Sequence, residues 1–366
     1  MKHNFQRAGI MLQFLKSYLE CDEQPISDFY YKKTSYKVGS ELPSVDERWE
    51  MFSGKDIFSG YDEHAWFYKK VILPKRLQNK NIYLRFSTNV YGWDAVNPQF
   101  IVYINGKIVQ ALDTNHTMVK LDSTMNEFDL YLYAYTGCVT PDWFTGKRVI
   151  PQFYLTAKIV EIDALAEKVY YDIKVPYEIM EYSDENTKEY QELLKGVTEI
   201  MNLLDFRKPH SKEYREALQK ASDYADKEFY GKICKKTLPQ VTCIGHTHID
   251  IAWLWTVAQT REKAQRSFAT VINLMRQYPE YKFMSSQAIL YQMVKEEAPE
   301  LYEEIKKAVK DGRWEVEGSM WVEADCNLIS GESLVRQILV GKNFFKQEFG
   351  IDTKLVLYLL KKEYFQ

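Results

Sequence analysis

The chain has 366 residues, of which 46% are apolar, and a formal net charge of -3. This length is sufficient for two or more domains with real hydrophobic cores. The nearly balanced charge, without a polybasic block, argues against binding to nucleic-acid phosphates, and the five cysteines form no CxxC pair, which argues against a disulfide framework or a thiolate zinc site.

The sequence contains no sign of a membrane or secretory segment. No stretch approaches the roughly 18 consecutive apolar residues that span a bilayer. Charged and polar residues interrupt the apolar positions of the N-terminus, so a signal peptide is not indicated. We therefore expect a cytoplasmic protein with neither a membrane nor a nucleic-acid partner.

The first half of the chain is expected to be rich in β-structure. Residues 1–29 are predicted to form an N-terminal helix and arm, and short runs of β-formers with turn residues between them predict a β-sandwich-like domain over residues 30–180. Asn105-Gly106 indicates a hairpin, because both turn residues tolerate positive φ. The expected strands cover residues 66–73, 82–86, 100–104, 107–109, 128–135 and 153–162.

Aromatic residues suit either a dense core or carbohydrate stacking. The chain holds 27 Tyr, 19 Phe and 8 Trp. Within the expected sandwich, Trp93 or Trp143 could stack against a sugar ring, although a domain that only packs and positions its neighbours explains them as well.

The second half changes from helices to strand–helix alternation. Residues 181–238 are predicted to be a helical connector, and residues 239–366 a parallel α/β domain of the doubly wound or barrel-like type. The fold class is thus α+β and multidomain: a β-sandwich, a connector, and a partial β/α-barrel-like catalytic domain. In the last domain strands are expected at 241–244, 281–284, 314–317 and 354–360, and helices at 256–277, 287–297, 299–311 and 331–349.

Three polar residues follow the first of these strands at alternate positions. In an extended backbone His246, His248 and Asp250 share one face, so their side chains are expected to converge. Two imidazoles and a carboxylate suit zinc or a similar divalent ion. A satisfied polar cluster is the competing interpretation.

Other candidates lie on the loops around this motif. Trp253 and Trp255 directly follow it and could stack on a sugar, or one of them could belong to the core. After the third strand, Glu323 and Asp325 are expected at the same rim, because ligands collect beyond the carboxyl ends of parallel strands. Either acid could instead cap the next segment.

Residues 241–357 resemble glycoside hydrolase family 38, the retaining α-mannosidases, and in particular its cytosolic and bacterial branch. The resemblance is carried by the strings His-Thr-His-Ile-Asp-Ile-Ala-Trp-Leu-Trp-Thr over 246–256, Phe-Met-Ser-Ser-Gln over 283–287 and Glu-Gly-Ser-Met-Trp-Val-Glu-Ala-Asp-Cys-Asn-Leu over 317–328. It implies a zinc enzyme, with cobalt as an alternative ion, that acts on α-mannosides or oligosaccharides by double displacement.

The resemblance also assigns individual residues. His248 and Asp250 are then the metal ligands, and Trp253 lies against the bound mannose. His246 becomes an orienting residue beside the metal ligands, which reduces the expected triad to two. Asp325 is a further candidate for substrate binding.

The sequence departs from the family after the fourth strand. An attacking Asp is expected just after Leu360, but the chain continues Lys-Lys-Glu-Tyr-Phe-Gln, in which Glu363 is the only carboxylate. We therefore name no catalytic residue and expect a truncated α-mannosidase that is inactive alone, unless a downstream polypeptide completes the domain. The alternatives are a metal-dependent amidohydrolase or deacetylase that uses the same loop, and a non-catalytic sugar-binding remnant.

Overall fold

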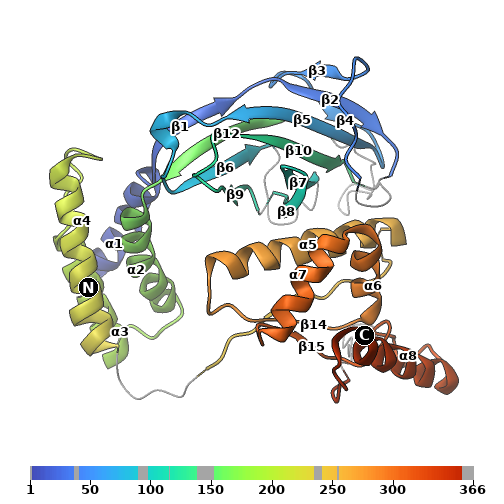
Figure 1. Ribbon diagram of the computed structural model, residues 1–366. Helices are drawn as coiled ribbons and strands as arrows, with labels where there is room; N and C mark the ends of the chain where they lie inside the picture. The colour runs from blue at the N-terminus through green and yellow to red at the C-terminus, as the bar shows by residue number, and fades with distance from the viewer. Residues whose placement is uncertain are drawn as a thin grey trace, which may run out of the picture.

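The computed structural model of the protein describes most of the chain and shows three packed parts (Figure 1). Trp93, Trp143 and the segment 357–366 with Leu360 and Glu363 lie outside the described residues. Along the described residues, no helix combines the length and apolar character that a membrane crossing needs. The described ranges are 2–36, 41–89, 98–114, 116–137, 152–234, 241–253 and 255–356.

Two antiparallel sheets form the sandwich that the sequence predicts. One sheet has four strands, in the order β1 (Glu20–Ile26), β12 (Thr156–Ile162), β6 (Ile82–Ser87) and β9 (Met118–Lys120). The other has six, in the order β3 (Glu50–Phe52), β2 (Phe29–Thr34), β5 (His64–Ile72), β10 (Glu127–Tyr135), β7 (Gln99–Ile104) and β8 (Lys107–Leu112). A short pair, β4 (Phe58–Ser59) with β11 (Gln152–Phe153), and the 3-10 turn η1 (Lys75–Leu77) complete this part.

Alternation of side chains along each strand builds the core between the sheets. In β6 the residues Ile82, Leu84 and Phe86 are buried, and they share one apolar cluster with Val102 and Leu132 of the six-stranded sheet. The hairpin from β7 to β8 turns at the expected dipeptide, in which both residues have positive φ. The hairpin prediction is therefore confirmed.

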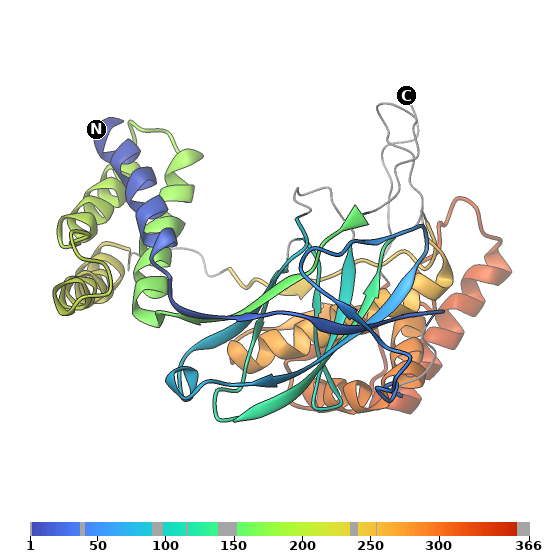
Figure 2. The same cartoon turned by 90° about the horizontal axis from the view of Figure 1, so that it is seen from above.

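A helical bundle stands beside the sandwich, as the views in Figures 1 and 2 agree. Its apolar cluster contains residues from all of its helices. The members are α1 (Lys2–Ser17), α2 (Ala164–Glu181), α3 (Lys188–Asn202), α4 (Lys212–Tyr224) and the π-helix η2 (Ala225–Ile233).

Two of the expected domain boundaries, at residues 29 and 180, differ from those in the structure. The sandwich strands end at Ile162, and residues 164–181 are helical because the side chain of Asp163 caps α2 and because Val169, Ile173 and Met180 are buried along one stripe. The N-terminal arm is also not separate. Its helix α1 packs in the bundle, and β1 pairs with β12 in the sandwich.

The last part is an α/β unit with a parallel sheet. Three strands lie side by side in chain order, β13 (Gly245–His246), β14 (Phe283–Ser285) and β15 (Trp314–Val316). Aromatic side chains fill its core, where the rings of Phe268, Phe283 and Tyr291 contact Trp314. The helices are α5 (Val257–Gln277), α6 (Ala288–Glu297), α7 (Pro299–Lys310) and α8 (Gly331–Phe349), close to the expected positions.

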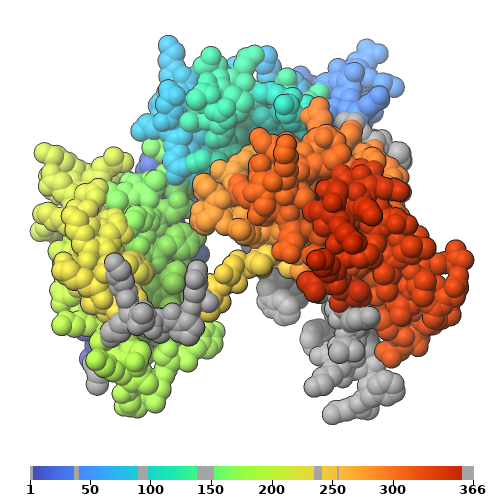
Figure 3. All heavy atoms as spheres, turned by 60° about the horizontal axis from the view of Figure 1, so that its bottom comes forward, coloured from blue at the N-terminus to red at the C-terminus, as the bar shows by residue number. Residues whose placement is uncertain are grey.

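The structure corrects the first strand of this unit, whereas most of the expected fourth strand, residues 357–360, lies outside the described residues. Residues 241–244 form no strand; they cross the hollow between the bundle and the α/β unit in Figure 3, where Val241 is 78% exposed and its backbone has no neighbouring strand to pair with. The first strand is therefore the two-residue β13. Of the expected fourth strand, only Val356 pairs within the described residues, in a parallel bridge with Gly318.

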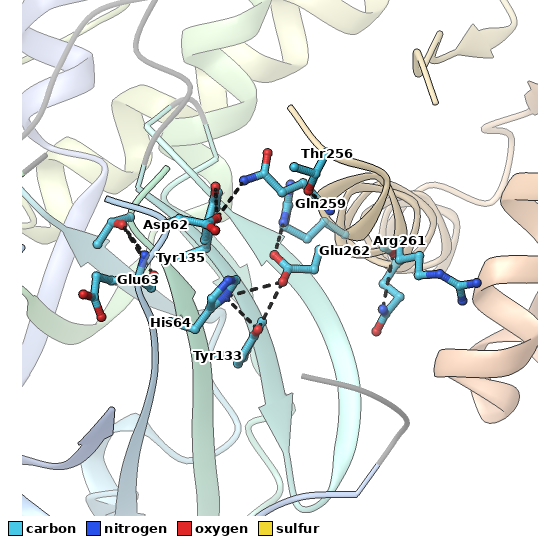
Figure 4. Close-up of polar contacts among 12 residues, drawn as sticks. Asp62, Glu63, His64, Tyr133, Tyr135, Thr256, Gln259, Arg261 and Glu262 are labelled. Atoms are coloured by element: carbon cyan, nitrogen blue, oxygen red, sulfur yellow. Dashed lines mark hydrogen bonds and ion pairs between the residues drawn. The ribbon is translucent and has the colours of Figure 1, made fainter. Parts of the chain in front are cut away.

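A buried polar network fixes α5 against the six-stranded sheet. Glu262 of α5 is 1% exposed and accepts a hydrogen bond of 3.1 Å from the hydroxyl of Tyr133, which is itself 2.7 Å from Nδ1 of His64. Arg266, one helical turn further along, lies 3.4 Å from the second oxygen of Glu262. Figure 4 shows Glu262 pointing from α5 toward the two sheet residues. The sandwich thereby holds the helix that follows the histidine motif.

Burial of His64 predicts a loss of stability on acidification. Burial lowers the pKa of this imidazole below its ordinary value of 6.5, so below about pH 6.5 the unfolded chain binds a proton more readily than the folded one. The contribution of neutral His64 to the free energy of unfolding is complete above pH 6.5. It falls as the pH drops toward the lower pKa that His64 has in the folded protein.

The comparison that isolates this effect is between the wild type and His64→Gln. Urea unfolding at pH values from 8 to 5.5 should show the wild type losing more stability than the variant. His116 donates a hydrogen bond to Asp113 that raises the pKa of its imidazole, so it has the opposite pH dependence, but it is present in both proteins. A difference between the two proteins that does not change with pH would contradict the prediction.

Candidate active site

The loop between β13 and α5 is held in place by the first turns of that helix. The side chain of Thr256 caps α5 by accepting a hydrogen bond from the backbone of Gln259. The indole of Trp255 donates to the carbonyl of Asp250 at 3.2 Å, and the hydroxyl of Thr260 donates to the carbonyl of Ile251. Backbone groups of an irregular loop thus find partners, which gives the loop a defined path.

The structure brings His248 and Asp250 together at the end of β13, as the motif predicts. Nε2 of His248 lies 3.1 Å from Oδ1 of Asp250. The other ring nitrogen, Nδ1, lies 2.9 Å from Oε2 of Glu323 on the loop after β15. The side chains of His248 and Asp250 are 30% and 42% exposed, whereas that of Glu323 is only 4% exposed. The pair therefore faces solvent, with a buried carboxylate behind it.

Glu323 is itself fixed by the loop after β14. Its second carboxylate oxygen accepts a hydrogen bond from the hydroxyl of Ser286, and its backbone N–H donates to the side-chain carbonyl of Gln287 at 3.3 Å. Gln287 also donates to the carbonyl of Ile249 at 2.9 Å, and it holds a backbone φ of 62°. A strained residue with two such contacts ties together the loops that follow all three strands.

From the sequence we predicted that Glu323 lies at the rim of the site or caps the next segment, and we predicted no role for Ser286 or Gln287. The available signals were that all three stand directly beyond parallel strands and that they lie in the two later strings of the family resemblance. Their side-chain contacts depend on how three loops meet in space, which no local pattern encodes.

This donor set fits a divalent cation. A neutral imidazole carries one N–H and one lone pair, so it can donate to only one of the two carboxylates that flank His248. If Nδ1–H donates to Glu323, the lone pair of Nε2 faces the Asp250 carboxylate, and a cation between these two atoms satisfies both. A carboxylate on the far nitrogen is the arrangement by which proteins orient metal-binding histidines.

The pair is nevertheless an incomplete ligand set. Within the described ranges, no three His, Cys, Asp or Glu side chains are gathered so that they could hold a metal ion. Catalytic zinc sites usually have three protein ligands. A further ligand would have to come from residues beyond those described.

The remaining predicted site residues make no hydrogen bond or ion pair with His248 or Asp250 in the described part of the chain. His246 lines a cavity with His248, and in the described part of the chain it hydrogen-bonds to neither His248 nor Asp250. Trp253 is 58% exposed and stands edge-on to Trp255, with ring centroids 5.6 Å apart. Asp325 is exposed and accepts a hydrogen bond of 2.9 Å from the backbone of Asn327, as a turn cap does.

Comparison with known proteins places this chain among the glycoside hydrolases. Residues 238–359 match the family model described as the glycosyl hydrolases family 38 N-terminal domain. Residues 238–359 thus carry a family 38 N-terminal domain, as the histidine motif and the two later strings predict.

Curated relatives are α-mannosidases. The chain is 30% identical over 295 residues to alpha-mannosidase G of Dictyostelium discoideum, a match that covers 78% of this chain and 26% of that protein. It is 37% identical over 166 residues to human alpha-mannosidase 2C1, over 45% of this chain and 15% of the relative. The chain thus spans about a quarter or less of the length of these relatives.

Among solved structures, a β-glucuronidase from Bacteroides uniformis shares 16% identity with a TM-score of 0.29, over 38% of this chain and 18% of that one. A likeness of this size carries no conclusion about the site.

Proposed function

We propose that this chain supplies the metal-binding and sugar-stacking part of an α-mannosidase active site. The observation that carries the proposal is the juxtaposition of His248 and Asp250 at the end of β13, with Glu323 on the opposite ring nitrogen. Curated α-mannosidases of the same family support the reaction class, hydrolysis of an α-mannoside.

Each residue has a definite role in this proposal. His248 and Asp250 would hold a divalent ion, zinc in the first instance and cobalt as an alternative. The bound ion would supply Lewis-acid polarisation and orientation of sugar hydroxyls. Trp253 offers its exposed ring to one face of the mannose, while His246 and Asp325 lie on the neighbouring loops as candidates for orienting the ligands and contacting the sugar.

We also propose that the parallel sheet is the beginning of a larger β/α-barrel-like domain. The bridge between Gly318 and Val356 adds a third parallel pairing to those of β13 with β14 and of β14 with β15. The attacking carboxylate that double displacement requires would then follow a strand beyond those described.

Binding of methyl α-mannoside to the 366-residue protein tests the proposal. Calorimetry in the presence of zinc should show saturable binding that a chelator abolishes. Replacing Trp253 by alanine should weaken binding about 2- to 10-fold, because aromatic stacking contributes roughly 0.5–1.5 kcal/mol. Tyr278→Ala, which removes an exposed aromatic side chain away from these loops, serves as the matched control.

Two results would overturn the proposal. Methyl α-glucoside could bind as well as the mannoside with or without zinc, or the protein could hydrolyse acetylated sugars with no affinity for mannosides. The second outcome would favour an amidohydrolase instead.

The buried carboxylate of Glu323 gives a separate prediction about metal affinity. Glu323→Gln should lower the affinity for Zn²⁺ about 10- to 100-fold, since an amide is a poorer partner for the far nitrogen of a metal-binding imidazole. A competition titration with a chromogenic chelator measures this directly, and Glu280→Gln on an exposed loop is the control. Equal affinities in the Glu323 and control variants would remove Glu323 from the site.

A further inference from the structure

A cavity of about 340 Å³ lies at the seam between the sandwich and the α/β unit. Gln99 and Ala111 line it from the six-stranded sheet, and Lys263 and Arg266 line it from α5. The segment 246–249, which carries two of the motif histidines, forms a third part of the wall. A ligand in this cavity would therefore contact both units and the loop that begins the active site.

Among the described residues that line the cavity, cationic side chains exceed acidic ones by one. Among the lining residues that the structure describes, Asp113 is the only acid. Two cationic side chains, Lys263 and Arg266, oppose it, and the imidazoles of His116, His246 and His248 complete the polar part of the lining. A cavity with such a lining favours negative charge.

Two of the charged side chains in the wall already have partners. Arg266 lies 3.4 Å from the buried Glu262. Asp113 accepts from His116 at 3.0 Å, a hydrogen bond that raises the pKa of that imidazole. These contacts fix the positions of the groups around the cavity and neutralise the charge of Asp113 in part.

Lys263 differs from its neighbours. In the part of the chain that the structure describes, no carboxylate lies within 4.0 Å of its ammonium group, which instead stands 4.3 Å from the ring centroid of Trp255. Burial, together with the adjacent charge of Arg266, lowers the pKa of Lys263 to about 8. A half-buried ammonium group without a carboxylate beside it among the described residues is costly, and an anion would stabilise it.

We propose that this seam cavity binds a small oxyanion, a phosphate or carboxylate group, which Lys263 contacts directly. Its volume is at the lower end of the range of small-molecule sites, about 300–1,000 Å³, so it admits a single compact group. Trp255 and the aliphatic wall around Val271 leave room for an organic part beside the anion. The bound anion would bridge the sandwich and the α/β unit. This inference does not depend on mannosidase activity.

Isothermal titration of the 366-residue protein with inorganic phosphate and, in a second arm, with acetate tests the proposal. We expect saturable binding of at least one of them, and Lys263→Gln should weaken it about 10- to 100-fold, as removal of a charge-assisted hydrogen bond does. Lys310→Gln, at an exposed position at the end of α7, should bind like the wild type. Absence of saturable binding in both arms, or equal binding by the Lys263 variant, would overturn the proposal.

A labelling experiment on the unmodified chain avoids any effect of the substitution on folding. Mass spectrometry after brief acetylation should show phosphate or acetate protecting Lys263 selectively, with Lys310 as the internal reference. Equal labelling of Lys263 with and without the anions would contradict the site. Mannoside binding is measured separately, so failure of one proposal does not affect the other.

Discussion

Replacing Glu262 by alanine is expected to lower the free energy of unfolding by about 3–5 kcal/mol, the cost of leaving one member of a buried ion pair without its partner. Both Glu262 and Arg266 are buried, and Glu262 also accepts from Tyr133. The substitution removes the carboxylate that pairs with the Arg266 guanidinium and accepts from the Tyr133 hydroxyl. Urea denaturation followed by circular dichroism measures the change.

A second substitution separates the ion pair from simple loss of side-chain volume. Glu262→Ala combined with Arg266→Met should lose less than the sum of the two single changes, because the pair is removed together. Glu280→Ala, at an exposed loop position, should change stability by less than about 0.5 kcal/mol. If Glu262→Ala behaves like Glu280→Ala, the network does not hold the sandwich and α5 together.

Trp314→Ala is expected to cost about 3–5 kcal/mol, because it removes a large ring from the core of the α/β unit. The indole is 2% exposed, packs against Phe268 and Phe283, and donates to the hydroxyl of Tyr291 at 2.9 Å. Its loss leaves a cavity at the centre of the parallel sheet and a buried hydroxyl without its donor.

Trp314→Phe is the matched variant for this prediction. It retains most of the ring volume and loses the hydrogen bond, so it should cost less than the alanine variant. Thermal unfolding monitored by the near-ultraviolet signal of the aromatic core distinguishes the two. Equal losses in both variants would show that the hydrogen bond, not the packing, dominates at this position.

Local patterns in the sequence were sufficient for elements whose signals are themselves local. The hairpin at Asn105-Gly106 depends on positive φ at two adjacent residues, and α8 begins at the Ser330 cap and ends before Gly350 in the left-handed conformation. Both could be predicted because the turn and cap chemistry lies within a few residues.

Elements that depend on distant partners were predicted less well. The apolar run 241–244 has strand-forming residues but no neighbour to pair with, so tertiary context overrides its propensity. The expected sandwich domain extended to residue 180, but residues 164–181 form a helix that packs on α1 and α3.

The same difference between local signals and distant partners applies to the residues of the candidate site. The approach of His248 to Asp250 follows from their spacing, whereas Glu323 is 75 positions beyond His248 and meets it only because β13 and β15 flank β14 in one sheet. His246, on the same side of the motif, was expected to converge with the pair but makes no contact with it in the described residues. The extended backbone that would align all three ends at His246.

Titrating the protein with Co²⁺ and recording its visible absorption tests whether His248 and Asp250 together hold a divalent cation. We expect one saturable Co²⁺ site in the wild type, at which Zn²⁺ competes and which is absent in both His248→Ala and Asp250→Asn. The control variant His210→Ala should bind Co²⁺ like the wild type. Undiminished Co²⁺ binding in either of the first two variants would contradict this prediction.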